Sequence, residues 1–165
     1  MSSIHPAIVI GPPVYLPADP AKLALSLKPI HSIYSGQAKT LPPLVGTSSY
    51  VDVRDVAQAH LWAYEHPKLA DGERYITSGG YGPAQGIADI LRERYPEKQH
   101  IMAGEPGKGY VEGTNFCGKK VKVWYPKERP QLSGKKVFEV MGIEWIPMVE
   151  SVIDTAEAFA KLYHI

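Results

Sequence analysis

The sequence predicts an α/β fold with a few-stranded sheet, and two observations support this fold class. Short apolar runs typical of strands alternate along the chain with longer segments in which apolar residues recur at helical spacing. The length of 165 residues lies in the usual range of one domain and allows a sizeable core. We therefore expect a single substrate-binding-type domain over residues 1–165.

The amino-terminal part predicts a buried strand followed by a proline-rich wall. Residues 3–10 form a short apolar run closed by Gly11, and Pro6 marks where regular ladder hydrogen bonding should stop. From Pro12 to Pro43 the chain is rich in proline and predicts one helix over residues 20–27. We interpret this stretch as a surface lid or wall, because it is too apolar for a flexible linker.

A second strand and a helix follow. Residues 49–51 predict a brief strand, and Asp52 is the expected N-cap of a helix, with Asp55 as its partner in a shortened capping box. Two stripes at helical spacing predict that this helix is buried on most of its faces, and Pro67 ends it. The stripes are Val56, His60 and Ala63, and Ala57, Leu61 and Tyr64.

The rest of the chain adds one clear strand and three helices. In order they are a strand over residues 72–77, a helix from Pro83 to Pro96, a short helix from Ser133 to Met141 and a last helix that starts near Pro147. Signals between residues 101 and 129 are mixed, with polar-apolar alternation at 120–124. The two or three strands that can be assigned are few for a doubly wound sheet.

Composition and charge exclude several classes of protein. The 18 Lys and Arg nearly balance the 17 Asp and Glu, and the basic patches are too short for a nucleic-acid-binding face. No run approaches the roughly 18 apolar residues of a membrane span. Nothing at the amino terminus is typical of a signal peptide, and Cys117 is the single cysteine. We expect a cytoplasmic protein without nucleic-acid or membrane partners.

One string carries a resemblance to a known family. It covers residues 50–60, Tyr-Val-Asp-Val-Arg-Asp-Val-Ala-Gln-Ala-His. With His5-Pro6 before it and Gly72-Glu-Arg-Tyr-Ile76 after it, this string resembles the extended short-chain dehydrogenase/reductase family, in particular its aldehyde or methylglyoxal reductases and dihydroflavonol reductases. The similarity runs almost end to end. It implies a truncated Rossmann-like fold, the carboxyl-terminal substrate-binding part that follows the family's glycine-rich phosphate loop and catalytic Tyr-x-x-x-Lys pair.

The residues that would bind a dinucleotide are not found in this sequence. The glycine-rich run 104–109 is one residue short of a dinucleotide loop and no amphipathic helix follows it, while Gly79-Gly80-Tyr-Gly82 is either a turn or an anion site, with the turn favoured. The one Tyr-x-x-x-Lys match, Tyr64 to Lys68, contains Pro67, which breaks the helical turn that the pair needs. We therefore expect no cofactor and no independent hydride transfer.

Three side chains are candidate catalytic groups for proton transfer. The resemblance places His5 at the end of the first strand, where family members commonly carry Asn or Asp before the proline; an exposed histidine without a role is the equally weighted alternative. Tyr50 resembles a pocket residue of the family, and Glu112 can act as a base if it is buried. The candidate substrate-binding residues are Tyr15, His31, Tyr34, Tyr110, Phe116 and Cys117.

Other polar residues are expected to have structural roles. Asp52 and Arg54 should cap and brace the helix start, His60 should pack in the core and His66 should lie at the surface. No His, Cys, Asp or Glu cluster has the spacing of metal ligands, so we expect no metal.

Three functions stay open. They are a cofactor-independent isomerisation, dehydration or cyclisation of a small organic molecule, a noncatalytic binding module, and a fragment of an NADP-dependent reductase, which the apparent start Met1-Ser2-Ser3 disfavours. A few strands without their neighbours would leave an unpaired edge and an apolar face. We therefore expect a homodimer through that surface.

Overall fold

A computed structural model describes residues 1–41, 49–108, 111–114, 120–123 and 132–165. Its short strands form three small sheets. The strands are β1 (Ser3–Pro6), β2 (Ile8–Ile10), β3 (Ser49–Asp52), β4 (Arg74–Thr77), β5 (Gly80–Tyr81), β6 (Val111–Thr114) and β7 (Lys120–Val123). Strand β1 pairs in parallel with β4, β2 pairs in parallel with β3, and β5 and the β6–β7 hairpin add antiparallel pairs.

Helices surround these sheets. They are α1 (Lys28–Tyr34), α2 (Val53–Glu65), α3 (Pro67–Ala70), α4 (Ala84–Arg94), α5 (Lys135–Met141) and α6 (Met148–Tyr163), with a short 3-10 turn at Pro20–Lys22. The predicted caps explain several of these bounds. The side chain of Asp52 accepts the backbone N–H of Arg54 at the start of α2, and Gly142 adopts a left-handed φ of 68° where α5 ends.

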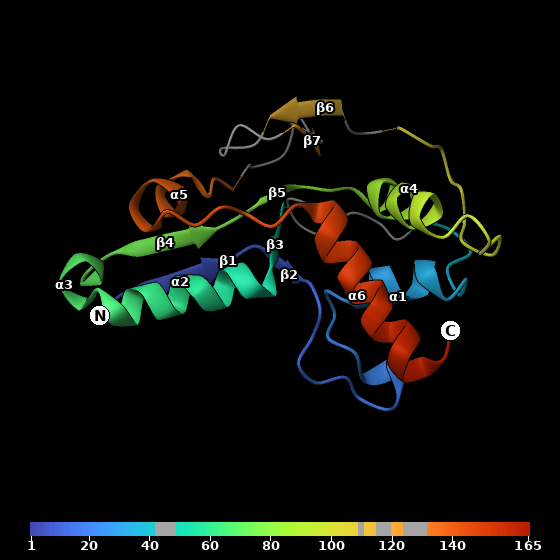
Figure 1. Cartoon of the computed structure of the whole chain (residues 1–165), viewed down its shortest axis with the longest axis horizontal. Helices are drawn as coiled ribbons and strands as arrows, with labels where there is room; N and C mark the ends of the chain where they lie inside the picture. Colours follow the sequence, from blue (N-terminus) through green and yellow to red (C-terminus); the bar gives the residue numbers. More distant parts are fainter. Residues whose placement is uncertain (42–48, 109–110, 115–119, 124–131) are drawn as a thin grey trace.

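Two apolar clusters lie at opposite ends of the elongated chain (Figure 1). One joins α1, α4 and α6 around Ile30, Leu91 and Phe159. The other joins the β1–β4 sheet, α2 and α5 around Tyr75, Val137 and Trp145. Strand β3 and the first turns of α2 and α6 lie between them. The α/β fold class predicted from the sequence is confirmed.

The apolar run 3–10 is not one strand but two, in different sheets. The backbone N–H of Ala7 donates to Thr77 on the β4 side, and the next residue, Ile8, already pairs with Tyr50 of β3. The prediction of a helix over residues 20–27 is also wrong. The Asp19 side chain caps only a single 3-10 turn, and the chain becomes helical again at Lys28.

Helix α2 is less buried than its sequence predicts. The stripe of Ala57, Leu61 and Tyr64 is exposed, and His60 is exposed rather than packed in the core, with its Nδ1 2.8 Å from the Val56 carbonyl oxygen. The capping-box prediction is half right, because Asp52 caps α2 while Asp55 bonds outside the helix. Among the described residues, no helix is long and apolar enough to cross a membrane.

Candidate functional site

A buried polar network joins β3 and α2 to α6. The carboxylate of Asp52, which is fully buried, accepts hydrogen bonds from the Arg54 backbone N–H at 2.8 Å, from its guanidinium at 2.9 Å and from the Ser151 hydroxyl at 2.6 Å. Burial by itself raises the pKa of Asp52, but these hydrogen bonds and the Arg54 charge hold it below its ordinary value. The guanidinium also contacts Asp154 of α6 at 2.8 Å.

The same network holds the turn that begins the proline-rich wall. The Gly11 backbone N–H donates to Thr155 Oγ1 at 3.1 Å, and the Thr155 hydroxyl donates to the Ser151 carbonyl oxygen at 2.6 Å. Gly11 has a φ of 111°, and a Cβ there would lie 2.8 Å from a carboxylate oxygen of Asp52. The roles predicted for Asp52 and Arg54, capping and bracing, therefore extend to fixing the wall against α6.

Tyr50 and Asp55 extend this buried polar network to the start of α6. The Tyr50 hydroxyl oxygen accepts the Met148 backbone N–H at 2.9 Å, and burial raises the pKa of this tyrosine. A carboxylate oxygen of Asp55 accepts the Ile146 backbone N–H at 3.1 Å, and burial raises the pKa of Asp55 to about 6. Tyr50 thus has a packing and hydrogen-bonding role, and its part in proton transfer stays a prediction.

His5 lies exposed near the carboxyl end of β1. Its Nε2 is 2.9 Å from Ser3 Oγ, and in the parallel register it lies opposite Ile76, which is 38% exposed. The carboxyl ends of parallel strands are where α/β folds bind ligands. Beside this end, three buried polar atoms lack hydrogen-bond partners in the described part of the chain: Thr77 Oγ1, Ser78 Oγ and Trp145 Nε1. Sequence reasoning missed Thr77 and Ser78, since a short polar pair at the end of a strand is common.

The wall residues do not gather around His5. Tyr15 is 81% exposed, whereas His31 and Tyr34 are buried in the α1–α4–α6 cluster. The His31 ring meets Phe159 and Tyr163 edge to face, at centroid distances of 5.3 Å and 5.4 Å, and burial lowers its pKa. Burial likewise raises the pKa of Tyr34. Ligand contacts by these three residues stay predictions.

Four other candidates fall where side chains are not described. Tyr110, Phe116 and Cys117 lie outside the described residues, and Glu112 is described only as part of the β6 backbone, which pairs with β7. Within the described ranges, no group of three or more His, Cys, Asp or Glu side chains could hold a metal ion.

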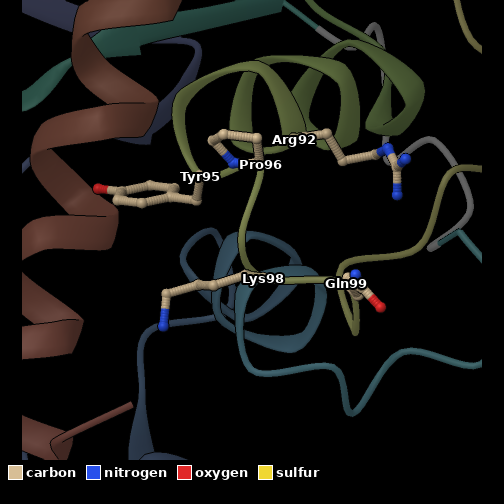
Figure 2. Close-up of a pocket in the computed structure, with 5 residues that line it drawn as sticks. All are labelled: Arg92, Tyr95, Pro96, Lys98 and Gln99. Carbon is tan, nitrogen blue, oxygen red and sulfur yellow. The ribbon is translucent and has the colours of Figure 1, made fainter.

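A pocket of about 230 Å³ opens at the end of α4, and none of the candidate site residues lines it. Figure 2 shows that Arg92 and Lys98, the two cations on its rim, extend to opposite sides of the opening. Arg92 donates to the Ile101 carbonyl oxygen at 2.8 Å, and the Lys98 ammonium lies 5.1 Å from the centre of the Tyr34 ring. Because the two cations do not converge, this pocket does not form an anion site.

The glycine-rich segments do not fit a dinucleotide. A Cβ at Gly82 would lie 1.9 Å from the Met148 sulfur, so this glycine makes room for packing within the chain. In the 104–109 loop the backbone N–H groups of Glu105 and Gly107 already donate to Gln85 and to the Asp89 carboxylate, at 2.7 Å and 2.8 Å. A carboxylate in that position would repel a pyrophosphate. The packing of Gly82 against Met148 agrees with the interpretation of residues 79–82 as a turn.

Relatives of known activity match nearly the whole chain. It is 29% identical over 163 residues to the NADPH-dependent methylglyoxal reductase of Saccharomyces cerevisiae, covering 98% of this chain and 43% of that protein. It is 30% identical over 162 residues to cinnamoyl-CoA reductase 1 of Arabidopsis thaliana, covering 98% of this chain and 40% of that one. The chain thus spans less than half the length of these relatives. No family model matches it.

The fold agrees with these sequence matches. The crystal structure of yeast methylglyoxal/isovaleraldehyde reductase Gre2 complexed with NADPH superposes with a TM-score of 0.72 at 27% identity, covering 99% of this chain and 44% of that one. Match and superposition confirm the resemblance found in the sequence. In sequence and in fold, the chain is similar to the carboxyl-terminal part of members of the extended short-chain dehydrogenase/reductase family.

Proposed function

We propose that residues 1–165 form the substrate-binding part of a reductase that acts on small carbonyl compounds. The nucleotide-binding part of that reductase lies outside these residues. One observation carries the proposal: no further described strand pairs with the parallel β1–β4 sheet, in a chain that aligns end to end with less than half of an NADPH-dependent reductase. The proposed ligand position is the carboxyl end of β1 and β4, beside His5 and below the first turn of the wall at Gly11.

His5 is the group proposed to contact the substrate. Its imidazole can donate to or accept from a carbonyl or hydroxyl oxygen, and it is positioned by the hydroxyl of Ser3, 2.9 Å from its Nε2. Carbonyl compounds are the proposed substrate class because the names of the relatives specify methylglyoxal and cinnamoyl-CoA. The nucleotide is assigned to the other part of the fold, since neither glycine-rich segment here fits it.

The test compares the 165-residue chain with a chimera. In the chimera, the part of the S. cerevisiae methylglyoxal reductase that precedes the matched segment is joined to Met1. Oxidation of NADPH is followed by absorbance with methylglyoxal and with cinnamoyl-CoA. We expect turnover by the chimera alone, reduced at least tenfold by His5→Ala and much less by Tyr15→Phe. Turnover by the isolated chain, or none by a folded chimera, would contradict the proposal.

A cofactor-independent reaction is the second candidate, and the His5–Ser3 pair favours it. An imidazole 2.9 Å from a hydroxyl can pass a proton in an isomerisation, dehydration or cyclisation. The isolated chain should then convert a small hydroxy-carbonyl compound without NADPH, and His5→Ala should abolish the reaction while His66→Ala, at an exposed position on α2's end, should not. If wild type and His5→Ala are equally inactive on a panel of such compounds but bind them, the noncatalytic binding module is favoured instead.

A further inference from the structure

The carboxyl-terminal turn of α6 holds the proline-rich wall at a second point, beyond the buried polar network. The Tyr163 hydroxyl donates to the Pro17 carbonyl oxygen at 2.7 Å. In Figure 1 the chain leaves β2, runs down beside α6 and reaches the 3-10 turn near the end of that helix. The wall is therefore bonded to α6 at Gly11 through Thr155 and at Pro17 through Tyr163.

Residues 12–16, which we call the wall loop, span the distance between these two points. The two prolines that begin the loop fix their own φ angles and have no N–H. Among the described residues, the backbone of the wall loop has no hydrogen-bond partner. Val14 and Tyr15 are exposed, whereas Leu16 packs against the α1–α4–α6 cluster. The position of the loop thus depends on its two anchored ends.

Helix α1 fixes the tyrosine that holds Pro17. The His31 ring meets the Tyr163 ring edge to face at a centroid distance of 5.4 Å and the Phe159 ring at 5.3 Å. Phe159 is fully buried, so the three rings form one packed group between α1 and α6. This packing restricts the Tyr163 ring, and His31 therefore helps to position the hydroxyl that binds the wall.

The wall loop begins beside the proposed ligand position. Gly11 follows the carboxyl end of β2, which pairs in parallel with β3, and ligands of α/β folds bind beyond such ends. A three-carbon compound held at His5 ends close to its carbonyl group. A carbonyl compound with a long apolar part extends from His5 toward the loop, where Val14 and Tyr15 offer apolar surface.

We propose that Tyr163 is a positioning residue, which anchors the wall loop at Pro17 so that the loop binds the apolar part of carbonyl compounds larger than methylglyoxal. This inference rests on the proposed function and adds a specificity determinant to the same site. The anchor uses a backbone oxygen of the wall, so the side chains of Val14 and Tyr15 keep their apolar surface for the substrate. Loss of the anchor should weaken the binding of large substrates selectively.

Trypsin tests the anchor in the isolated chain, without any activity. Between Gly11 and Ile30 trypsin can cut only after Lys22, because Lys28 precedes a proline. The next residue, Leu23, is 4% exposed, so cleavage requires this part of the wall to open. Tyr163→Phe keeps the ring and removes the hydroxyl, and it should speed the release of fragments 1–22 and 23–165 by about fivefold to tenfold.

Tyr81→Phe is the matched control for the loss of a tyrosine hydroxyl. The Tyr81 hydroxyl donates to the Leu132 carbonyl oxygen at 2.8 Å, a bond of similar length that does not involve the wall. This variant should change the rate of cleavage after Lys22 by less than about twofold.

The chimera described above tests the effect on specificity. Tyr163→Phe should raise the KM for cinnamoyl-CoA by about fivefold or more, while the KM values for methylglyoxal and NADPH stay within about twofold of the wild type. A general loss of stability would lower the activity with both carbonyl compounds alike. The ratio of the two kcat/KM values therefore separates positioning from folding.

Three results would overturn the proposal. They are cleavage of Tyr163→Phe at the wild-type rate, equal acceleration of cleavage by Tyr163→Phe and Tyr81→Phe, and KM values for the two carbonyl compounds that change by the same factor. A chimera that reduces neither compound would contradict the proposed function, whereas the trypsin result on the isolated chain would still decide whether Tyr163 anchors the wall.

Discussion

Replacing Asp55 by asparagine tests whether the buried polar network between α2 and α6 contains a titrating carboxylate. Asp55 is 2% exposed, and one of its carboxylate oxygens accepts the Ile146 backbone N–H at 3.1 Å. Burial is the main cause that raises its pKa to about 6, the nearby Asp52 charge adds to the rise, and the Ile146 hydrogen bond and Arg54 oppose it. Asparagine keeps an acceptor oxygen for Ile146 and has almost the same shape, so it removes the charge and little else.

The sign and the size of the effect follow from linkage. An acid whose pKa rises on folding binds its proton more tightly in the native state, so its contribution to stability is complete below the unfolded pKa of 3.8 and is lost as the pH rises through about 6. Each pH unit between the two pKa values corresponds to about 1.4 kcal/mol. Ionised Asp55 should therefore make the wild type less stable at pH 8 than at pH 4 by about 2 to 3 kcal/mol.

Urea unfolding at pH 4 and pH 8 measures this difference. The free energy of unfolding of Asp55→Asn, minus that of the wild type, should be about 2 to 3 kcal/mol larger at pH 8 than at pH 4. Glu139→Gln is the control, since its carboxylate is 57% exposed beside Lys135, and it should change stability by less than about 0.5 kcal/mol at either pH. A pH-independent difference for Asp55→Asn would refute the reasoning.

Three further substitutions have definite expected outcomes in urea unfolding. Tyr50→Phe removes the acceptor of a buried N–H and should cost about 1 to 3 kcal/mol; an unchanged midpoint would contradict this. Gly11→Ala, at a φ of 111° and against Asp52, should cost more than Gly72→Ala, where φ is 75° but the space is open. Thr77→Val removes a buried hydroxyl that has no partner among the described residues and should stabilise the chain by up to about 1 kcal/mol, so clear destabilisation would count against an unpaired hydroxyl.

The elements that the sequence predicted well are those fixed by local chemistry. Helix α6 starts directly after Pro147, and Val152, Ala156 and Phe159 at helical spacing are all buried. Asp52 precedes a helix whose first N–H groups lack partners within the helix, so its capping role follows from residue type and position alone. The string at residues 50–60 also identified the family, and the comparisons confirm it.

The wrong predictions of burial and strand bounds came from apolar patterns. Such a pattern does not specify which element will pack against it. Periodicity showed that Leu61 and Tyr64 form an apolar stripe, but both side chains are exposed, and among the described residues no element covers them. A continuous run such as residues 3–10 gives no alternation that marks where the chain changes sheet, and the change occurs at Ala7. His31 and Tyr34 lie in the wall that the resemblance places against a ligand; α1 buries both side chains, and their contact with a ligand stays a prediction.

The site could be predicted only in part, because its groups belong to two separately packed clusters. His5 is placed by the β1–β4 sheet, whereas the wall beyond Gly11 is placed by α6 through Thr155. Local sequence signals place each cluster but not their relative position, which depends on long-range contacts such as those of Asp52 with Ser151. A ligand between His5 and the wall would contact both clusters. Its affinity should therefore depend on the buried polar network between the clusters as much as on any side chain that touches the ligand.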